Sequence, residues 1–200
     1  MAGCKPCSTP MENRLRLSKS DGSPAVDATY YRSVVGSLRY LANTQADIAY
    51  AVGIVSRCME APTAQHMAAV RHLLRYISGT IHHGCKYQRG GGDEPDLVGY
   101  IDSDHGGDLD DRKSTSGKQK IIAMSSCEAE YVAAAAAAIK HIDLRYHFIR
   151  DCVETGKINI GYVGTEDQLA DVLTKSLGKI QFMELKKRIG VEEVQLGRCK

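Results

Sequence analysis

The chain has 200 residues, of which 43% are hydrophobic and 25% charged, so it can form one or two domains with a core and is neither fibrous nor wholly disordered. Its formal net charge of +2 is too small to indicate nucleic-acid binding, which would need a local basic cluster. No apolar run approaches the roughly 20 residues that cross a bilayer, and the N-terminus lacks the apolar stretch of a secretion signal. We therefore expect an intracellular, soluble protein with no membrane partner.

The cysteines indicate thiols and not a disulfide framework. There are seven of them, an odd number, with no secretion signal. The segment Cys4-Lys-Pro-Cys7 has the spacing of a redox motif, but it lies in a polar stretch and not where a strand meets a helix, so we interpret it as a simple pair of thiols. No Cys/His pair elsewhere has the spacing of a zinc site.

The first part of the chain predicts a polar leader followed by helices. Residues 1–29 are rich in Ser, Pro, Asp and Lys and are expected to be partly disordered. Residues 30–81 predict a helical unit of two amphipathic helices and a third that Thr63 can cap and Gly79 can stop. Its apolar residues, expected to pack in a core, are Val34, Val35, Leu38, Tyr40, Leu41, Ile48, Val52, Val55, Met59, Met67, Val70, Leu73, Leu74 and Ile77.

A glycine-rich stretch separates these helices from the second half of the chain. Residues 82–96 contain Gly90-Gly-Gly92 and predict a flexible connection. Residues 97–101 are then a short apolar strand candidate. Ser125 and Glu128 match a capping box, which predicts that a helix begins there and runs through the alanine-rich stretch.

The remaining elements alternate between helix and strand. Apolar spacing up to Val153 predicts a helix that Gly156 can end in the left-handed conformation. Residues 158–162 alternate as a strand does, and a capping-box pattern opens a helix over residues 165–178. A C-terminal helix over residues 181–189 completes an α/β chain, and residues 179–200 are expected to form this helix and a tail.

Several carboxylates are candidate metal ligands. Asp102 stands at the end of the first strand candidate, where its side chain can face a cleft and hold a divalent cation, and Asp104 is its close competitor. Glu128 and Glu130 lie about 200° apart around their helix axis, so at most one can point at Asp102, and the pattern does not choose between them. Asp171 offers a further carboxylate in the second turn of a later helix. Singly, each acid also fits an ordinary surface position.

Two other charged patterns have simpler interpretations. A calcium-binding EF-hand loop that starts at Asp102 would need an oxygen ligand at its fifth position and Glu at its twelfth, but Gly106 and Lys113 stand there. The basic clusters Arg71-His72 with Arg75, and Lys186-Lys-Arg188, are predicted to be solvated helix faces. Contact with phosphates is the alternative, which we rank below solubility.

Segments along the whole chain resemble the Pol polyprotein of copia-type retrotransposons. Those similar to the tail of its reverse transcriptase are Tyr31-Arg-Ser-Val-Val-Gly-Ser-Leu-Arg-Tyr-Leu-Ala-Asn43, Ser56-Arg-Cys-Met-Glu-Ala-Pro62, His66 and Leu73-Leu-Arg-Tyr-Ile-Ser-Gly-Thr80. Those similar to its ribonuclease H come later, in the family's order, and are Leu97-Val-Gly-Tyr-Ile-Asp-Ser-Asp-His-Gly-Gly-Asp108, Ser125-Ser-Cys-Glu-Ala-Glu-Tyr131, Lys140-His-Ile-Asp-Leu-Arg-Tyr-His-Phe-Ile-Arg150 and Glu166-Asp-Gln-Leu-Ala-Asp-Val-Leu-Thr-Lys175.

The resemblance implies a fold, a site and a substrate. Residues 97–178 would form a truncated ribonuclease-H-like mixed sheet with flanking helices, preceded by the small helical unit. Asp102, Glu130 and Asp171 would be the catalytic, metal-binding residues, with Glu130 favoured over Glu128. The implied cofactor is Mg²⁺, two ions about 4 Å apart, and the implied partner is an RNA/DNA hybrid whose RNA strand is hydrolysed.

The chain also departs from the family. Gly117 is joined directly to Lys118 where the family has a strand hairpin, and Ile139 is joined to Lys140 where it has a further strand and one more aspartate. A sheet without these strands has exposed faces and unpaired edges. We therefore expect a degenerate polyprotein fragment with little or no nuclease activity and no bound metal. The alternatives are an active magnesium nuclease and a repurposed nucleic-acid-binding protein.

Overall fold

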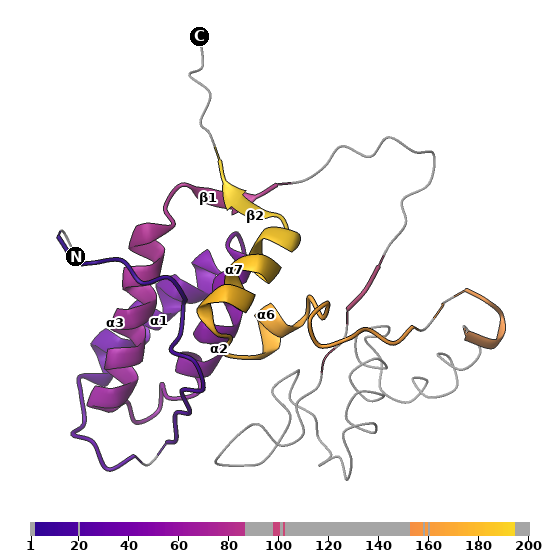
Figure 1. The fold of residues 1–200 in the computed structure, drawn as a ribbon. Coiled ribbons are helices and arrows are strands. Elements are labelled where there is room, and N and C mark those ends of the chain that lie inside the picture. Colours follow the sequence, from indigo (N-terminus) through magenta and orange to yellow (C-terminus); the bar gives the residue numbers. More distant parts are fainter. Residues whose placement is uncertain are drawn as a thin grey trace. The chain divides into compact units, whose positions relative to one another are not determined.

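The computed structural model describes residues 3–19, 21–86, 98–100, 102, 153–157, 159 and 161–194. The chain divides into two compact units. Unit 1 consists of Met1–Asp96 together with Asp171–Lys200, and unit 2 is Leu97–Ala170. All the helices and strands labelled in Figure 1 belong to unit 1. Unit 1 is therefore built from two stretches that are far apart in the sequence.

Helix α1, Ala28–Leu41, begins where Asp27 supplies an N-cap. The Asp27 carboxylate accepts hydrogen bonds from the backbone N–H groups of Thr29 at 2.8 Å and Tyr30 at 3.2 Å, which satisfies two donors that the first helical turn leaves without partners. Its buried side chains are Tyr31, Val35 and Leu38. The expectation that Tyr40 joins this buried stripe is wrong: Tyr40 is 81% exposed, because two residues beyond Leu38 the helix has turned its side chain away.

Two shorter elements follow. The 3₁₀ helix η1, Ala46–Ile48, leads into α2, Ala49–Ser56, and Ile48, Val52 and Val55 are buried. The predicted apolar spacing of this stretch is confirmed. The phenol of Tyr31 donates a hydrogen bond of 2.8 Å to the backbone carbonyl of Val55, which fixes α1 to α2.

Helix α3, Ala64–Gly79, has the predicted cap and the predicted end. The Thr63 hydroxyl accepts from the His66 N–H at 3.5 Å, and the His66 ring accepts from the Thr63 N–H at 3.0 Å, so the two residues form a reciprocal capping box. The helix ends at Gly79, as expected. Met67, Val70 and Leu73 bury the face that packs in the core.

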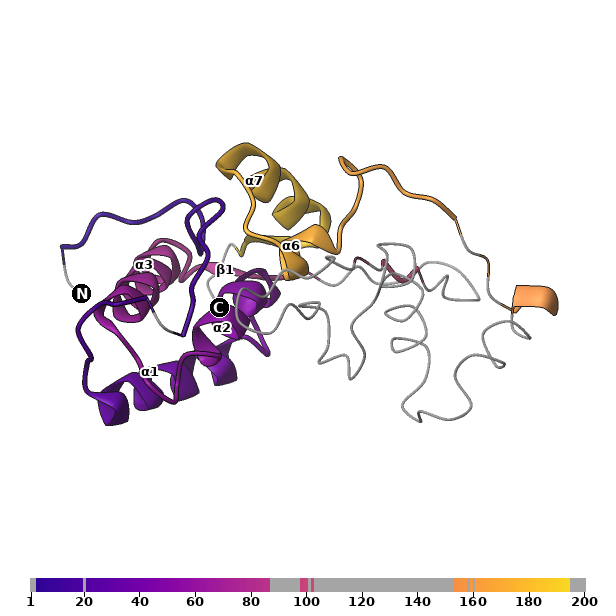
Figure 2. The same cartoon turned by 90° about the horizontal axis from the view of Figure 1, so that it is seen from below.

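The C-terminal part of unit 1 adds two helices and a strand. These are α6, Asp171–Thr174, α7, Lys179–Arg188, and β2, Val191–Glu193. Figure 2 shows α6 next to α2, which it contacts together with η1, and α7 contacts α6. Helix α7 confirms the predicted C-terminal helix.

A two-stranded antiparallel sheet joins the two stretches of unit 1. Strand β1, His83–Cys85, pairs with β2 so that Gly84 faces Glu192. β1 lies in the stretch where a connection was expected. Gly190 precedes β2 with φ +80°, and a Cβ built on it would lie 3.1 Å from the Lys86 carbonyl oxygen, so this turn requires glycine. The fold is therefore mixed α/β, with helices and one small sheet among the described residues.

Several expectations about residues 97–178 are wrong or concern residues outside the described ranges. Residues 98–100 form no strand, and Val98 is 63% exposed, so this stretch buries too little apolar surface to be a core strand. Tyr162, in the second strand candidate, is 95% exposed and also outside any strand. The prediction that Gly156 ends a helix in the left-handed conformation is confirmed, because Gly156 has φ +69° and follows helical residues. The alanine-rich helix lies outside the described residues.

Candidate active site

The three carboxylates predicted to hold metal ions have different places in the chain. Asp102 is half-buried and belongs to unit 2. Glu130, like its competitor Glu128 and like Asp104, lies outside the described residues. Asp171 is the first residue of α6, in unit 1. The three-carboxylate site therefore stays a prediction.

The surroundings of Asp171 are defined by its burial and by a hydrogen bond to a lysine. Its side chain is buried, with 1% of the residue exposed, and its Oδ1 accepts a hydrogen bond of 2.9 Å from the Lys175 ammonium one turn later in the chain. The expectation that Asp171 sits in the second turn of a helix from residue 165 is wrong. Residues 165–167 form a turn instead, and the Gln168 amide oxygen accepts from the Ala170 N–H at 3.4 Å before the helix begins.

The donor set around Asp171 does not resemble an open metal site. Its carboxylate is already balanced by an ammonium group, whereas a magnesium site leaves carboxylate oxygens available to the ion. Within the described ranges, no group of three His, Cys, Asp or Glu side chains is arranged to hold a metal ion.

A buried polar cluster that the sequence patterns did not indicate ties α7 to the first helices. Lys186 in α7 places its ammonium 2.9 Å from Asp47 Oδ2 and donates a hydrogen bond of 2.6 Å to the Tyr76 hydroxyl oxygen. The Tyr76 hydroxyl in turn donates to Asp47 Oδ2. The side chains of Asp47 and Lys186 are 0% and 3% exposed, so this is a fully desolvated ion pair.

The prediction that Lys186 belongs to a solvated basic face is therefore wrong, while its neighbours Lys187 and Arg188 are exposed as predicted. Phe182 and Leu185 are buried on the same helix, and Lys186 lies four residues after Phe182, on the same helix face. That spacing is the signal from which its burial could have been inferred. No comparable local signal identifies Asp47 or Tyr76 as its partners.

Aromatic packing and burial complete the cluster. The rings of Tyr76 and Phe182 meet edge to face, with centroids 5.8 Å apart and planes at 78°. Burial, followed by the nearby Asp47 carboxylate, raises the pKa of the Tyr76 hydroxyl far above its usual value, so this group is a neutral donor. Oδ1 of Asp47 is buried and accepts no hydrogen bond from the described part of the protein. Removal of one member of this buried network should therefore destabilise the fold.

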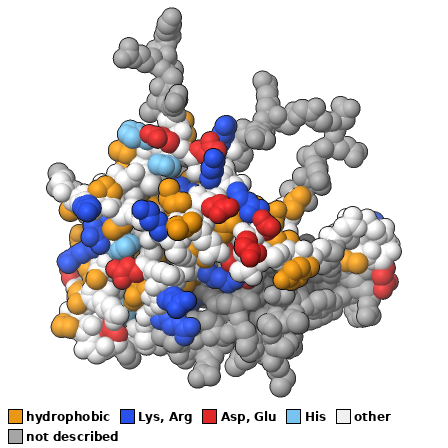
Figure 3. Space-filling model, viewed as in Figure 1, with side chains coloured by type: hydrophobic (Ala, Val, Ile, Leu, Met, Phe, Trp, Pro, Cys, Tyr) orange, Lys and Arg blue, Asp and Glu red, His pale blue; other side chains and the backbone are white. Residues whose placement is uncertain are grey.

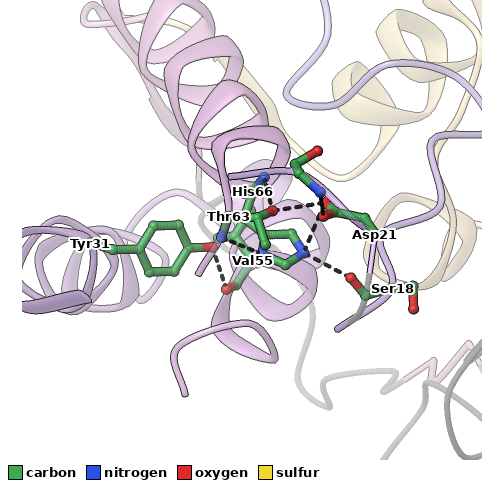
Figure 4. Close-up of polar contacts among 7 residues, drawn as sticks. Ser18, Asp21, Tyr31, Val55, Thr63 and His66 are labelled. Atoms are coloured by element: carbon green, nitrogen blue, oxygen red, sulfur yellow. Dashed lines mark hydrogen bonds and ion pairs between the residues drawn. The ribbon is translucent and has the colours of Figure 1, made fainter. Parts of the chain in front are cut away.

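A second polar cluster holds the N-terminal segment against α3 (Figure 4). The Thr63 hydroxyl donates to Asp21 Oδ2 at 2.7 Å, and the Ser23 N–H donates to Asp21 Oδ1 at 2.8 Å. These bonds, that of Thr63 first, lower the pKa of the Asp21 carboxyl. His66 Nδ1 accepts from the Thr63 backbone, so Nε2 carries the proton and donates to the Ser18 carbonyl at 2.9 Å.

The face seen in Figure 3 carries charges of both signs over the described residues. On the side seen in Figure 3, basic and acidic side chains are interspersed among apolar ones over the described part of the molecule. Of the other basic cluster, Arg71 is exposed as predicted, but His72 and Arg75 are only half-exposed. The described helices are all too short or too polar to span a membrane.

Comparison with known proteins defines the family. The chain is 35% identical to the retrovirus-related Pol polyprotein from transposon RE1 of Arabidopsis thaliana, over 97% of this chain and 17% of that protein. It is 33% identical to the corresponding polyprotein from transposon TNT 1-94 of Nicotiana tabacum, over 96% of this chain and 19% of that protein. It is also 38% identical to secreted RxLR effector protein 161 of Plasmopara viticola, over 52% of this chain and 82% of that protein.

The chain belongs to the retrovirus-related Pol polyproteins. Within that class its relatives are those of copia-type transposons, and it spans less than a fifth of their length. The RE1 alignment extends over 251 positions, which exceeds the 200 residues of this chain, so part of that relative is aligned with gaps here. No family model and no solved structure matches the chain.

Proposed function

We propose that this chain is a degenerate fragment of a copia-type retrotransposon polyprotein, derived from its reverse-transcriptase tail and ribonuclease H, with little or no nuclease activity. The ancestral reaction is hydrolysis of the RNA strand of an RNA/DNA hybrid, in which Asp102, Glu130 and Asp171 would hold Mg²⁺ and the metal would supply an activated water and charge stabilisation. Asp102, Glu130 and Asp171 are the proposed remains of that site. The main observation that supports loss of activity is that the Asp171 carboxylate is buried and bonded to the Lys175 ammonium.

The state of Asp171 argues against its use as a metal ligand. A carboxylate that holds magnesium must offer its oxygens to the ion, yet Oδ1 of Asp171 is bonded to the Lys175 ammonium in a position that is almost fully buried. To recruit it, an incoming ion would have to displace this ammonium and would then lie next to its positive charge, which opposes binding.

The gaps in the alignment support the same proposal. Segments missing at the two proposed junctions, Gly117 with Lys118 and Ile139 with Lys140, would account for such gaps. A site that needs several carboxylates to neutralise two divalent cations loses affinity for both ions when one carboxylate is absent. Loss of these segments would also remove strands that support Asp102.

A cleavage assay tests this proposal. The purified chain is incubated with a labelled RNA/DNA hybrid and Mg²⁺, and we expect no cleavage above that of buffer. Cleavage that is abolished by Asp102→Asn would overturn the proposal and establish an active nuclease. Hybrid binding that weakens steeply with salt, without cleavage, would identify a nucleic-acid-binding protein instead.

A chimera with the missing segments inserted serves as a positive control for the absence of cleavage. In this chimera the segments that RE1 has at the two junctions are inserted between Gly117 and Lys118 and between Ile139 and Lys140. We expect the chimera to cleave the hybrid and its Asp102→Asn variant to be inactive. A chimera that folds cooperatively but does not cleave would show that the gaps are not the cause of inactivity.

A further inference from the structure

The segment Cys4-Lys-Pro-Cys7 lies against α3 through His72. His72 Nε2 is 2.9 Å from the backbone carbonyl oxygen of Thr9. A carbonyl oxygen can only accept a hydrogen bond, so Nε2 carries a proton and, in the neutral ring, Nδ1 does not. The Thr9 carbonyl therefore sets the tautomer of His72 and leaves Nδ1 as an acceptor.

The acceptor nitrogen of His72 faces a thiol. Cys7 Sγ lies 3.9 Å from His72 Nδ1, and the thiol is the donor because Nδ1 carries no proton. Glu12 Oε1 lies 3.6 Å from the same nitrogen. A proton that moves from the thiol to Nδ1 would therefore lie close to this carboxylate. A thiol next to an imidazole base is the arrangement that activates cysteine nucleophiles.

Close packing keeps the segment in place. A Cβ built on Gly79 of α3 would come within 2.8 Å of Pro6 Cβ, so the approach of Pro6 depends on the absence of a side chain at position 79. Pro6 is adjacent to Cys7, and this contact holds the thiol beside His72. Cys4 lies three residues before Cys7 and is exposed. The pair thus combines one thiol with a base and one thiol open to solvent.

We propose that Cys7 is an activated thiol, that Cys4 is its resolving partner, and that together they exchange with low-molecular-mass disulfides such as oxidised glutathione. This site is independent of the nuclease region. It also changes the interpretation of the two residues from a simple thiol pair, because His72 supplies the base that the sequence context did not indicate.

The reaction has two steps. The proton of Cys7 passes to His72 Nδ1, and the Cys7 thiolate attacks one sulfur of oxidised glutathione; the disulfide bond breaks, and the leaving glutathione thiolate takes the proton from His72. Cys4 then loses its proton to solvent, and its thiolate attacks Cys7 Sγ; the bond between Cys7 and glutathione breaks, and the second glutathione leaves as a thiolate that takes a proton from solvent. The protein disulfide forms, two thiols of the protein are oxidised, and one glutathione disulfide is reduced to two thiols.

Site-resolved kinetics on the full reduced chain test the proposal. Oxidised glutathione is added, the reaction is stopped by alkylation, and each cysteine is followed by peptide mass spectrometry. Cys85 is the matched control, because it is also half-buried but its Sγ donates to the Thr44 carbonyl, which cannot take a proton. At pH 7 we expect Cys7 to react about tenfold faster than Cys85 and to end as a disulfide with Cys4.

Three variants test separately the resolving thiol Cys4, the base His72 and the packing of Pro6 against Gly79. Cys4→Ser should accumulate the mixed disulfide at Cys7. His72→Gln should slow Cys7 about tenfold at pH 7 but not near pH 10, where thiols ionise without a base. Gly79→Val, which displaces Pro6, should slow Cys7 at pH 7 as well. The proposal is overturned if Cys7 reacts no faster than Cys85, if no link to Cys4 forms, or if His72→Gln slows the reaction equally at both pH values.

Discussion

The ammonium of Lys186 lies 2.9 Å from the carboxylate of Asp47, and both side chains are almost fully buried although the two residues are far apart in the sequence. A buried ion pair contributes little net stability in many proteins, but the loss of one partner leaves the other charge without compensation. The pair therefore fixes which residue of Lys186-Lys-Arg188 enters the core, and so the position of α7 on the helical unit.

Replacement of Lys186 by Met should lower the free energy of unfolding of unit 1 by about 3–5 kcal/mol, because Asp47 is left buried and unpaired. Urea unfolding followed by circular dichroism measures this loss. Lys187→Met is the matched control, since Lys187 is exposed, and should change the free energy by less than about 0.5 kcal/mol. Equal effects of the two substitutions would contradict the buried pair.

Two tyrosines should resist ionisation. Burial raises the pKa of Tyr31 and Tyr76 well above the ordinary 10.0, so the folded state keeps their protons while the unfolded state loses them above pH 10. The unfolded state then binds fewer protons, and the free energy of unfolding falls as pH rises above 10. Tyr31→Phe and Tyr76→Phe should each reduce this alkaline loss, measured by urea unfolding between pH 8 and 11.

The contribution of Asp21 should appear at neutral pH and disappear in acid. Its folded pKa lies below the unfolded value of 3.8, mainly because Thr63 donates to it, so its stabilisation is present above pH 3.8 and is lost as pH falls through the folded value. Asp21→Asn should therefore be less stable than wild type at pH 6, and the difference should shrink below pH 3.8. A difference that stays constant down to pH 2 would exclude this linkage.

Two glycine substitutions should have opposite signs. Gly190→Ala forces a side chain into φ +80° and against the Lys86 carbonyl, and should cost about 1–2 kcal/mol. Gly36→Ala lies inside α1, where the added Cβ meets no atom within 4 Å beyond its chain neighbours and the nearby backbone of its own helix, and should stabilise by about 0.5–1 kcal/mol through helix propensity. Thermal unfolding of both variants compares the two shifts.

Local chemistry explains what could be predicted from the sequence. The cap at Thr63 and the ends at Gly79 and Gly156 depend on neighbouring residues, and the structure has all three. The helix expected over residues 165–178 is reduced to α6, because a turn at residues 165–167 replaces its first part. A capping-box pattern alone does not ensure a helix when the following residues bury little.

Long-range contacts explain what could not be predicted. The pairing of β1 with β2 joins two three-residue strands far apart in the chain, and neither has enough length to be recognised by alternation. The burial of Asp171 depends in the same way on packing of α6 against η1 and α2. For the candidate site, family resemblance selected Asp102, Glu130 and Asp171, and composition and spacing alone left each acid with an ordinary alternative.

The division of unit 1 into two stretches has a consequence for biosynthesis. During translation, Asp47 and Tyr76 emerge from the ribosome long before Lys186. Until Lys186 has been made, the carboxylate of Asp47 therefore lacks its ammonium partner. The first helices can bury the Asp47 carboxylate as an ion pair only after α7 has been translated. Folding of the first helices is thus coupled to the last part of translation, and a nascent chain stalled before α7 should be recognised by chaperones and proteases as unfinished.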